Sequence, residues 1–138
     1  MGSPLPAFFR IAVYLCLTAG MLPVQIFALQ FRLKFAKRLP LIYHRLCARV
    51  LGFHIRTHGK MATSPPVLFV CNHTSYSDIA ILGSLLPASF VAKAEVAGWP
   101  FFGVLAKLQR TVFVDRRPAR ASRQRDERIR RLEAGDNL

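Results

Sequence analysis

A histidine and an aspartate lie five residues apart in segment 72–78, between two apolar runs of the chain. Such a pair can do acid–base chemistry, because a carboxylate that holds one ring nitrogen of histidine leaves the other nitrogen free to take a proton. On one continuous helix His73 and Asp78 would point roughly 140° apart and could not meet. If His73 lies in a loop before the helix, the turn can fold its ring back onto the Asp78 carboxylate.

The same segment also fits a purely structural role. Ser75 followed by Asp78, ahead of the apolar residues 79–82, resembles a capping box, in which the serine caps a helix and the acidic residue sits in its first turn. A cap accounts for Ser75 and Asp78 but not for His73. A histidine at the carboxyl end of a buried parallel strand lies where α/β sheets place ligand groups. From these residues alone, a catalytic pair and a cap with an incidental histidine both stay open.

Residues 67–71 form a continuous apolar run, which predicts a buried parallel strand with Cys71 in the core. The alternation in residues 54–58 predicts an edge strand. Strands alternate with helices farther along, which indicates an α/β domain. The aromatic residues of segment 99–102 are expected in its core, with contact to lipid or an acyl chain as the alternative. The remaining predicted strands are 89–92 and 111–115, and the predicted helices are 76–86, 99–108 and 119–134.

Residues 11–31 form an uncharged, mainly apolar run of 21 residues. A helix of that length is roughly 31 Å long, close to the hydrocarbon thickness of a bilayer. Pro23, Gln25 and Gln30 interrupt the run, so a kinked or re-entrant helix competes with a full crossing. Basic residues are denser after the run than before it. This flank predicts that the rest of the chain, with any active site, faces the cytoplasm.

Residues 41–52 interleave apolar and basic side chains, which predicts an amphipathic helix with Pro40 near its start and Gly52 at its end. Such a helix could lie on an anionic lipid surface or pack one face on its own domain. We therefore divide the chain into a membrane-anchoring part, residues 1–52, and an α/β part, residues 53–138.

The net charge of +13 and the pI of about 11.1 require an anionic partner, either nucleic acid or an anionic membrane. The charge adjoins the apolar run and no recognised nucleic-acid motif is present, so membrane lipid is the expected partner and nucleic acid is not. The three cysteines show no disulfide framework. Cys71 and His73 are the closest cysteine–histidine pair and do not make a zinc ligand set by themselves, so no zinc site is expected.

Three segments together carry a resemblance to a known family. Asn72-His73-x-Ser75-x-x-Asp78 resembles the NHxSxxD motif of the glycerolipid acyltransferases typified by 1-acylglycerol-3-phosphate acyltransferase. Residues 92–96 and 100–103 are similar to the family's AKxEL and PFFG segments. Residues 110–116 are similar to its second motif, GxxFI(D/E)R. The three segments follow one another in the family's order, and the resemblance extends over essentially the whole chain.

The resemblance implies roles for individual residues. His73 would be the general base that takes the proton from the hydroxyl of a lysophospholipid, and Asp78 would orient it. Arg116, with Lys93 and Ser75, would contribute to the binding site of the acceptor. The donor would be acyl-CoA or acyl-carrier protein as co-substrate, and no metal or other cofactor is expected. The expected acceptor is lysophosphatidic acid in phospholipid biosynthesis, with a lyso-ornithine lipid as the alternative.

Two departures from the family pattern stand out. Arg110 occupies the position where the second motif usually has glycine. The third motif, Phe-Pro-Glu-Gly-Thr, and a fourth are missing, so we expect a truncated acyltransferase domain that is inactive or nearly so on its own. Without the His73–Asp78 pair, the same sequence would fit a non-catalytic basic protein of the membrane surface.

Overall fold

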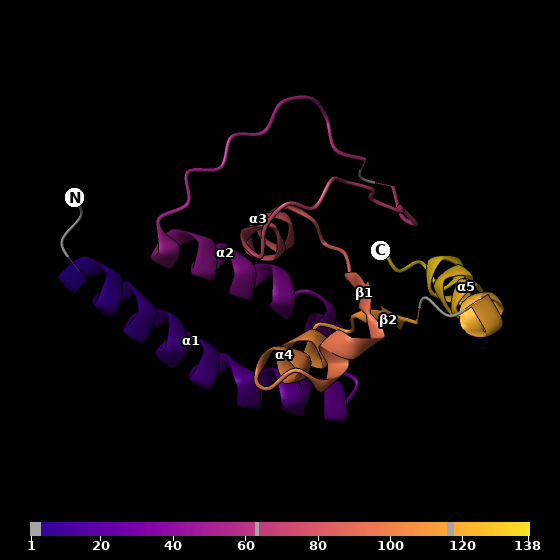
Figure 1. Cartoon of the computed structure of the whole chain (residues 1–138), viewed down its shortest axis with the longest axis horizontal. Coiled ribbons are helices and arrows are strands. Elements are labelled where there is room, and N and C mark those ends of the chain that lie inside the picture. The colour runs from indigo at the N-terminus through magenta and orange to yellow at the C-terminus, as the bar shows by residue number, and fades with distance from the viewer. Residues whose placement is uncertain (1–3, 63, 116–117) are drawn as a thin grey trace. The chain divides into compact units, whose positions relative to one another are not determined.

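A computed structural model describes residues 4–62, 64–115 and 118–138 (Figure 1). These residues form two compact units, Met1–Thr57 with His73–Pro87, and His58–Asn72 with Ala88–Leu138. The chain is rich in helix and contains a small parallel sheet, which agrees with an α/β class in broad terms. In chain order the described elements are α1 (Pro4–Gln30), η1 (Lys34–Lys37), α2 (Leu39–Leu51), α3 (Ser77–Leu85), β1 (Val91–Lys93), η2 (Ala94–Gly98), α4 (Phe102–Leu108), β2 (Val112–Val114) and α5 (Pro118–Glu133).

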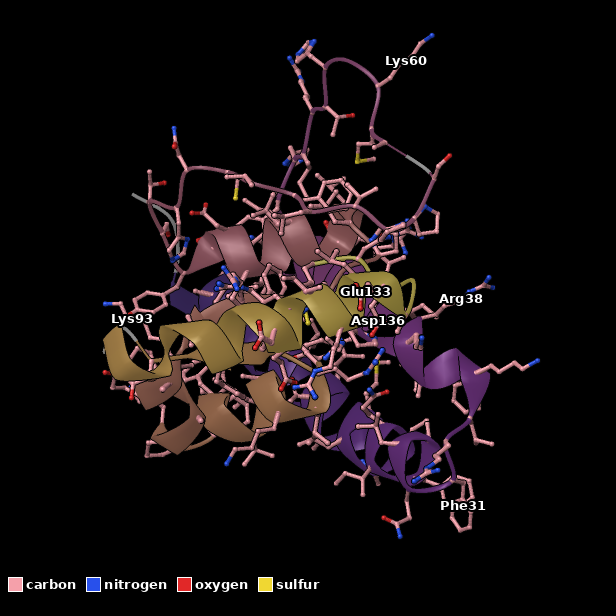
Figure 2. The ribbon with its side chains drawn as sticks, turned by 90° about the vertical axis from the view of Figure 1, so that its right-hand side faces the viewer. Phe31, Arg38, Lys60, Lys93, Glu133 and Asp136 are labelled. Atoms are coloured by element: carbon pink, nitrogen blue, oxygen red, sulfur yellow. The ribbon has the colours of Figure 1, made fainter. Side chains whose placement is uncertain are left out.

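The predicted apolar helix of the first unit is confirmed as α1, which continues through Pro23. Residues 6–30 of α1 are long and apolar enough to cross a membrane, and only 17% of their most apolar window is buried. Figure 2 shows Phe31 just past the end of this helix, with its ring on the outside. The exposed apolar side chains of α1 are Phe8, Phe9, Ile11, Leu15, Val24, Ile26 and Phe27.

Two polar side chains within α1 face the protein instead. Thr18 and Gln25 are buried. The Thr18 hydroxyl lies 3.0 Å from the Tyr43 hydroxyl of α2, and Gln25 Nε2 donates to the carbonyl of Ala36 at 3.2 Å. A helix with polar groups turned inward and apolar groups turned outward is the reverse of a helix on a water-soluble core. It is the arrangement expected of a helix in lipid, where polar side chains are satisfied inside the protein.

The predicted amphipathic helix is confirmed as α2, which Gly52 caps with a φ of +79°. Helix α3 packs on α2, where Arg45 Nε donates to the carbonyl of Ser84 at 3.0 Å. His44 lies so close to Gly83 that a Cβ atom at residue 83 would be 2.7 Å from His44 Cγ. Glycine is therefore required for α2 and α3 to approach this closely.

In the second unit β1 and β2 pair in parallel, with Val91 opposite Val112 and Lys93 opposite Val114. The predicted strands 89–92 and 111–115 are thus confirmed within a few residues. The predicted helix at 99–108 is confirmed from Phe102 onward as α4, and residues 94–98 form η2, which was not predicted. The predicted basic helix 119–134 corresponds to α5, and Gly135 follows it with a φ of +78°.

Two strand predictions and two burial predictions were wrong. Residues 54–58 form no strand, and residues 67–71 are not a buried strand, since Val70 is 86% exposed and Cys71 is exposed as well. Segment 67–69 does bond to Leu138, whose N–H donates to the carbonyl of Val67 and whose carbonyl accepts from the N–H of Phe69. An apolar run predicts burial only where other elements cover both of its faces, and the described residues leave one face of this run open. The predicted core position of Trp99, Phe101 and Phe102 was also wrong, because all three are exposed.

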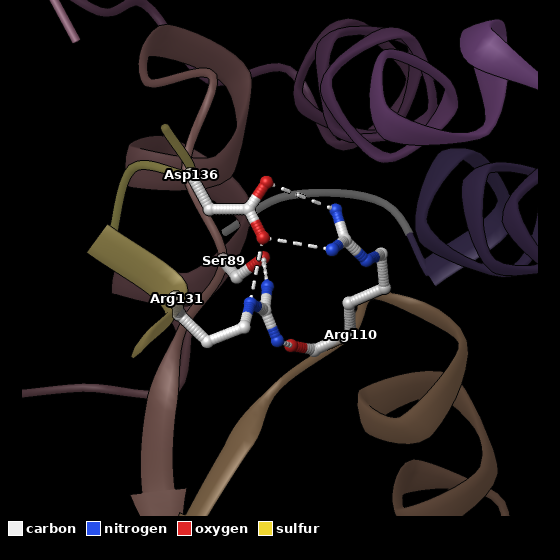
Figure 3. Close-up of polar contacts among 4 residues, drawn as sticks. All are labelled: Ser89, Arg110, Arg131 and Asp136. Atoms are coloured by element: carbon white, nitrogen blue, oxygen red, sulfur yellow. Dashed lines mark hydrogen bonds and ion pairs between the residues drawn. The ribbon is translucent and has the colours of Figure 1, made fainter. Parts of the chain in front are cut away.

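A buried ionic cluster fixes the end of the second unit (Figure 3). The Asp136 carboxylate, 7% exposed, accepts from Arg110 Nη2 at 2.8 Å and from Arg131 Nε at 2.6 Å. Arg131 also donates to the Ser89 hydroxyl at 3.0 Å and to the carbonyl of Arg110 at 3.3 Å. The cluster therefore links α5, the segment before β1 and the turn before β2.

Candidate active site

His73 and Asp78 meet in the turn that precedes α3. His73 Nδ1 lies 3.0 Å from Asp78 Oδ2. The same carboxylate oxygen accepts the backbone N–H of Thr74 at 2.8 Å and that of Ser75 at 2.9 Å. The loop position of His73 thus allows the contact that a continuous helix would forbid.

The start of α3 also explains the serine. The Ser75 hydroxyl accepts the N–H of Ser77 at 3.2 Å, and the Ser75 carbonyl accepts the N–H of Asp78 at 3.1 Å. Asp78 returns a bond to the N–H of Ser75, as the acidic residue of a capping box does. The cap and the histidine–carboxylate pair are therefore present together and share one oxygen atom. A role of Ser75 in substrate binding stays a prediction.

The electrostatics of this turn set the tautomer of His73. The backbone N–H groups of Ser75 and Thr74, followed by His73, lower the pKa of the Asp78 carboxyl below its ordinary value. Asp78 is therefore ionised at neutral pH and can only accept hydrogen bonds. His73 Nδ1 must then donate, which leaves Nε2 of the neutral ring as the proton acceptor. The His73 side chain is 62% exposed, so this nitrogen is accessible.

The other predicted site residues belong to other parts of the chain. Arg116 lies outside the described residues. Lys93 ends β1 in the second unit and is exposed (Figure 2). Their roles in binding the acceptor stay predictions. Among the residues that the structure describes, no three His, Cys, Asp or Glu side chains form a group that could hold a metal ion.

Sequence reasoning did not predict the backbone conformation of two residues, both with positive φ. Arg110 has a φ of +62° and Phe101 a φ of +61°. Glycine adopts this region readily and other residues rarely do. The related motif has glycine at position 110, and this was a signal that Arg110 adopts a positive φ. No signal in the sequence points to the second.

A histidine–carboxylate pair at a helix start, in a chain that also carries a lipid-type helix, defines a candidate acid–base site of a membrane-associated protein. The sequence model of the Acyltransferase family matches residues 54–138, which include this pair. The chain belongs to this acyltransferase family.

Similar proteins carry related names. The chain is 45% identical over 132 residues to a lyso-ornithine lipid O-acyltransferase of Brucella abortus, a match that covers 95% of the chain and 49% of that protein. It is 42% identical over 102 residues to a lyso-ornithine lipid O-acyltransferase of Rhizobium meliloti, covering 74% and 35% of the two chains. It is 36% identical over 77 residues to a 1-acyl-sn-glycerol-3-phosphate acyltransferase of Neisseria gonorrhoeae, covering 54% and 29%. The chain thus spans half or less of these relatives, and no solved structure matches it.

Proposed function

We propose that the protein transfers an acyl chain from a thioester donor to the free hydroxyl of a lysolipid, with His73 as general base. The observation that supports this most directly is the hydrogen bond of 3.0 Å between His73 Nδ1 and the ionised Asp78 carboxylate. An alcohol is a weak nucleophile at neutral pH and needs a base at the moment of attack. The exposed Nε2 of His73 is suited to be that base.

In the proposed reaction His73 Nε2 takes the hydroxyl proton as the lysolipid oxygen attacks the thioester carbonyl. The imidazolium that forms is stabilised by the Asp78 carboxylate. As the carbon–sulfur bond breaks, the leaving thiolate takes that proton from His73. The products are the acyl ester and a free thiol of coenzyme A or of acyl-carrier protein, and His73 returns to its neutral form.

The names of the relatives favour a lyso-ornithine lipid as the acceptor over lysophosphatidic acid. The two lyso-ornithine lipid enzymes are 45% and 42% identical to the chain, against 36% for the glycerol-3-phosphate enzyme. Both acceptors present an anion, the ornithine carboxylate or the phosphate. Arg116, with Lys93, would pair with either anion through charge-assisted hydrogen bonds.

The proposed place of the reaction is the cytoplasmic face of a membrane. Helix α1 turns its large apolar side chains outward, and its Thr18 and Gln25 towards α2 and η1, as expected of a helix in lipid. The basic residues Arg32, Lys34, Lys37 and Arg38 follow α1 directly, and such residues are retained on the cytoplasmic side.

The proposal is tested with residues 1–138 joined to the carboxyl-terminal half of the Brucella relative, so that all family motifs are present. His73→Ala should lower the rate of acyl transfer from acyl-CoA or acyl-carrier protein by about 10²–10⁴-fold. Asp78→Asn should also be severely impaired, because the neutral amide no longer fixes the tautomer of His73. His58→Ala, at an exposed histidine outside the turn, is the matched control and should keep the full rate. A normal rate in His73→Ala would refute the catalytic role.

A further inference from the structure

The second unit contains a strained turn that displays aromatic side chains. Phe101 has φ +61° and ψ −58°, and the N–H of Phe102 donates to the carbonyl of Pro100 at 2.6 Å. This combination defines a γ-turn of the classic form, which is rare and strained for a residue with a side chain. Strain of this kind persists only where the surrounding structure imposes it, and it often accompanies function.

Hydrogen bonds and one close approach surround the turn. The N–H of Trp99 donates to the carbonyl of Val96, and the carbonyl of Trp99 accepts the N–H of Gly103. A Cβ atom at Gly103 would lie 2.6 Å from the carbonyl oxygen of Ala97, so only glycine allows α4 to start this close to η2. The turn is therefore held between η2 and α4.

This frame holds apolar side chains in solvent. Trp99 and Phe101 are each 41% exposed and Phe102 is 57% exposed. Val104, which is 51% exposed, extends this surface along α4. The rings of Phe101 and Phe102 pack edge to face at 5.4 Å. We call these four residues the aromatic patch. Exposed apolar side chains that gather in one place mark a surface with a partner.

The size and charge of the aromatic patch fit a bilayer surface and not a second copy of the chain. Aromatic side chains bury about 150–250 Å² each, so the exposed fractions of the three leave on the order of 200–350 Å². A stable interface needs roughly 800 Å² from each partner. Tryptophan and phenylalanine anchor proteins at the lipid–water boundary with a few side chains. The charged residues of segment 91–108 are Lys93, Glu95 and Lys107, and all three are exposed. The segment therefore has a net positive charge, which anionic headgroups would attract.

We propose that the aromatic patch of Trp99, Phe101, Phe102 and Val104 is a second membrane contact, through which the second unit inserts its γ-turn into the headgroup region of the bilayer. This contact is separate from α1 and does not depend on the proposed chemistry. It would hold the second unit at the surface where a lysolipid acceptor resides.

Trp99 is the only tryptophan of the chain, so it is a built-in probe. The full chain is reconstituted in vesicles of phosphatidylethanolamine and phosphatidylglycerol whose acyl chains carry bromine at defined depths. We expect the emission of Trp99 to shift to the blue, to lose intensity most with the shallowest bromines, and to become resistant to iodide in the water. Flotation of the vesicles measures separately whether α1 binds lipid.

Two variants test the turn and one serves as control. Phe102→Ser removes an exposed ring, and Phe101→Gly relieves the positive φ while removing the other ring. Both should lower the bromine quenching of Trp99 in vesicle-bound chains without changing the bound fraction. Phe8→Ser, at a 73% exposed position of α1, should lower the bound fraction but leave the quenching of bound chains unchanged.

Trp99 that stays open to iodide and insensitive to brominated lipid in floated chains would overturn the proposal. Shielding from iodide that rises with protein concentration, again without bromine quenching, would overturn it in favour of contact between copies. Loss of acyl transfer in His73→Ala is independent of either result, so failure of this proposal and of the proposed function are distinguishable.

Discussion

Replacing Arg110 by glycine and by alanine separates two opposing contributions to stability at one position. The backbone of Arg110 is in the left-handed region, with a φ of +62°, and its guanidinium pairs with the buried Asp136 carboxylate at 2.8 Å. Alanine removes the ion pair and keeps the backbone strain. Glycine removes the ion pair and relieves the strain. The difference between the two variants therefore measures the strain that the arginine side chain compensates.

The magnitudes follow from the geometry. Losing a hydrogen bond to a charged group costs about 1.5–3 kcal/mol, and Asp136 keeps its bond of 2.6 Å to Arg131 in either variant. We expect Arg110→Ala to lower the free energy of unfolding by that amount. A left-handed conformation costs a residue with a side chain about 1–2 kcal/mol, so Arg110→Gly should be more stable than Arg110→Ala by about 1 kcal/mol. Asp136→Asn removes the carboxylate that pairs with both arginines and should cost about 3 kcal/mol, the lower end for a broken buried pair.

Urea unfolding in mild detergent, followed by the fluorescence of Trp99, measures these differences in the second unit. Arg125→Ala is the control, because the Arg125 side chain is 71% exposed and its pairing with Asp126 is long, at 3.8 Å. Exposed pairs of this kind contribute little, so this variant should stay within about 0.5 kcal/mol of the parent. Equal stability of Arg110→Gly and Arg110→Ala would refute the account of compensated strain.

Two further predictions concern the first unit. Gly83→Ala should lower its free energy of unfolding, measured by circular dichroism, by about 1–3 kcal/mol, because the new methyl group would meet His44, whereas Gly20→Ala, with nothing within 4 Å of the new Cβ, should not destabilise it. Loss of helix stability in both variants would contradict the packing explanation. The Asp78 carboxyl, followed by ¹³C NMR, should titrate below the ordinary aspartate value. Because the folded pKa is lowered, its stabilising effect is complete above the unfolded pKa and is lost as the pH falls through the folded one. His73→Ala should raise the midpoint only slightly, since the N–H groups of Ser75 and Thr74 are the larger causes; a midpoint restored to the ordinary value would show that His73 dominates instead.

Local signals in the sequence predicted the helices well. Helix α2 ends at Gly52 and α5 before Gly135, where a positive φ suits glycine. The end of α3 before Pro87 was also correct. These features depend on neighbouring residues only, which a single sequence contains in full.

Burial could not be predicted in the same way, because it depends on which elements cover a segment. The apolar run 67–71 looks like a central strand in the sequence, yet its Val70 is exposed and its bonds run to Leu138, about 70 residues away. The aromatic residues of segment 99–102 look like core, yet a strained turn holds them in solvent. Neither the partner of a strand nor a positive φ at phenylalanine is encoded in hydrophobic periodicity.

The turn before α3 shows why the two interpretations of segment 72–78 could not be separated in the sequence. A capping box places an acidic side chain over the free N–H groups of the helix start, and Asp78 Oδ2 accepts those of Thr74 and Ser75. A third acceptor direction on that oxygen receives His73 Nδ1. The N–H groups keep Asp78 ionised, and an ionised Asp78 requires His73 to carry its proton on Nδ1. The cap and the histidine contact therefore use the same carboxylate oxygen, so in the proposed reaction one side chain would both cap the helix and orient the base.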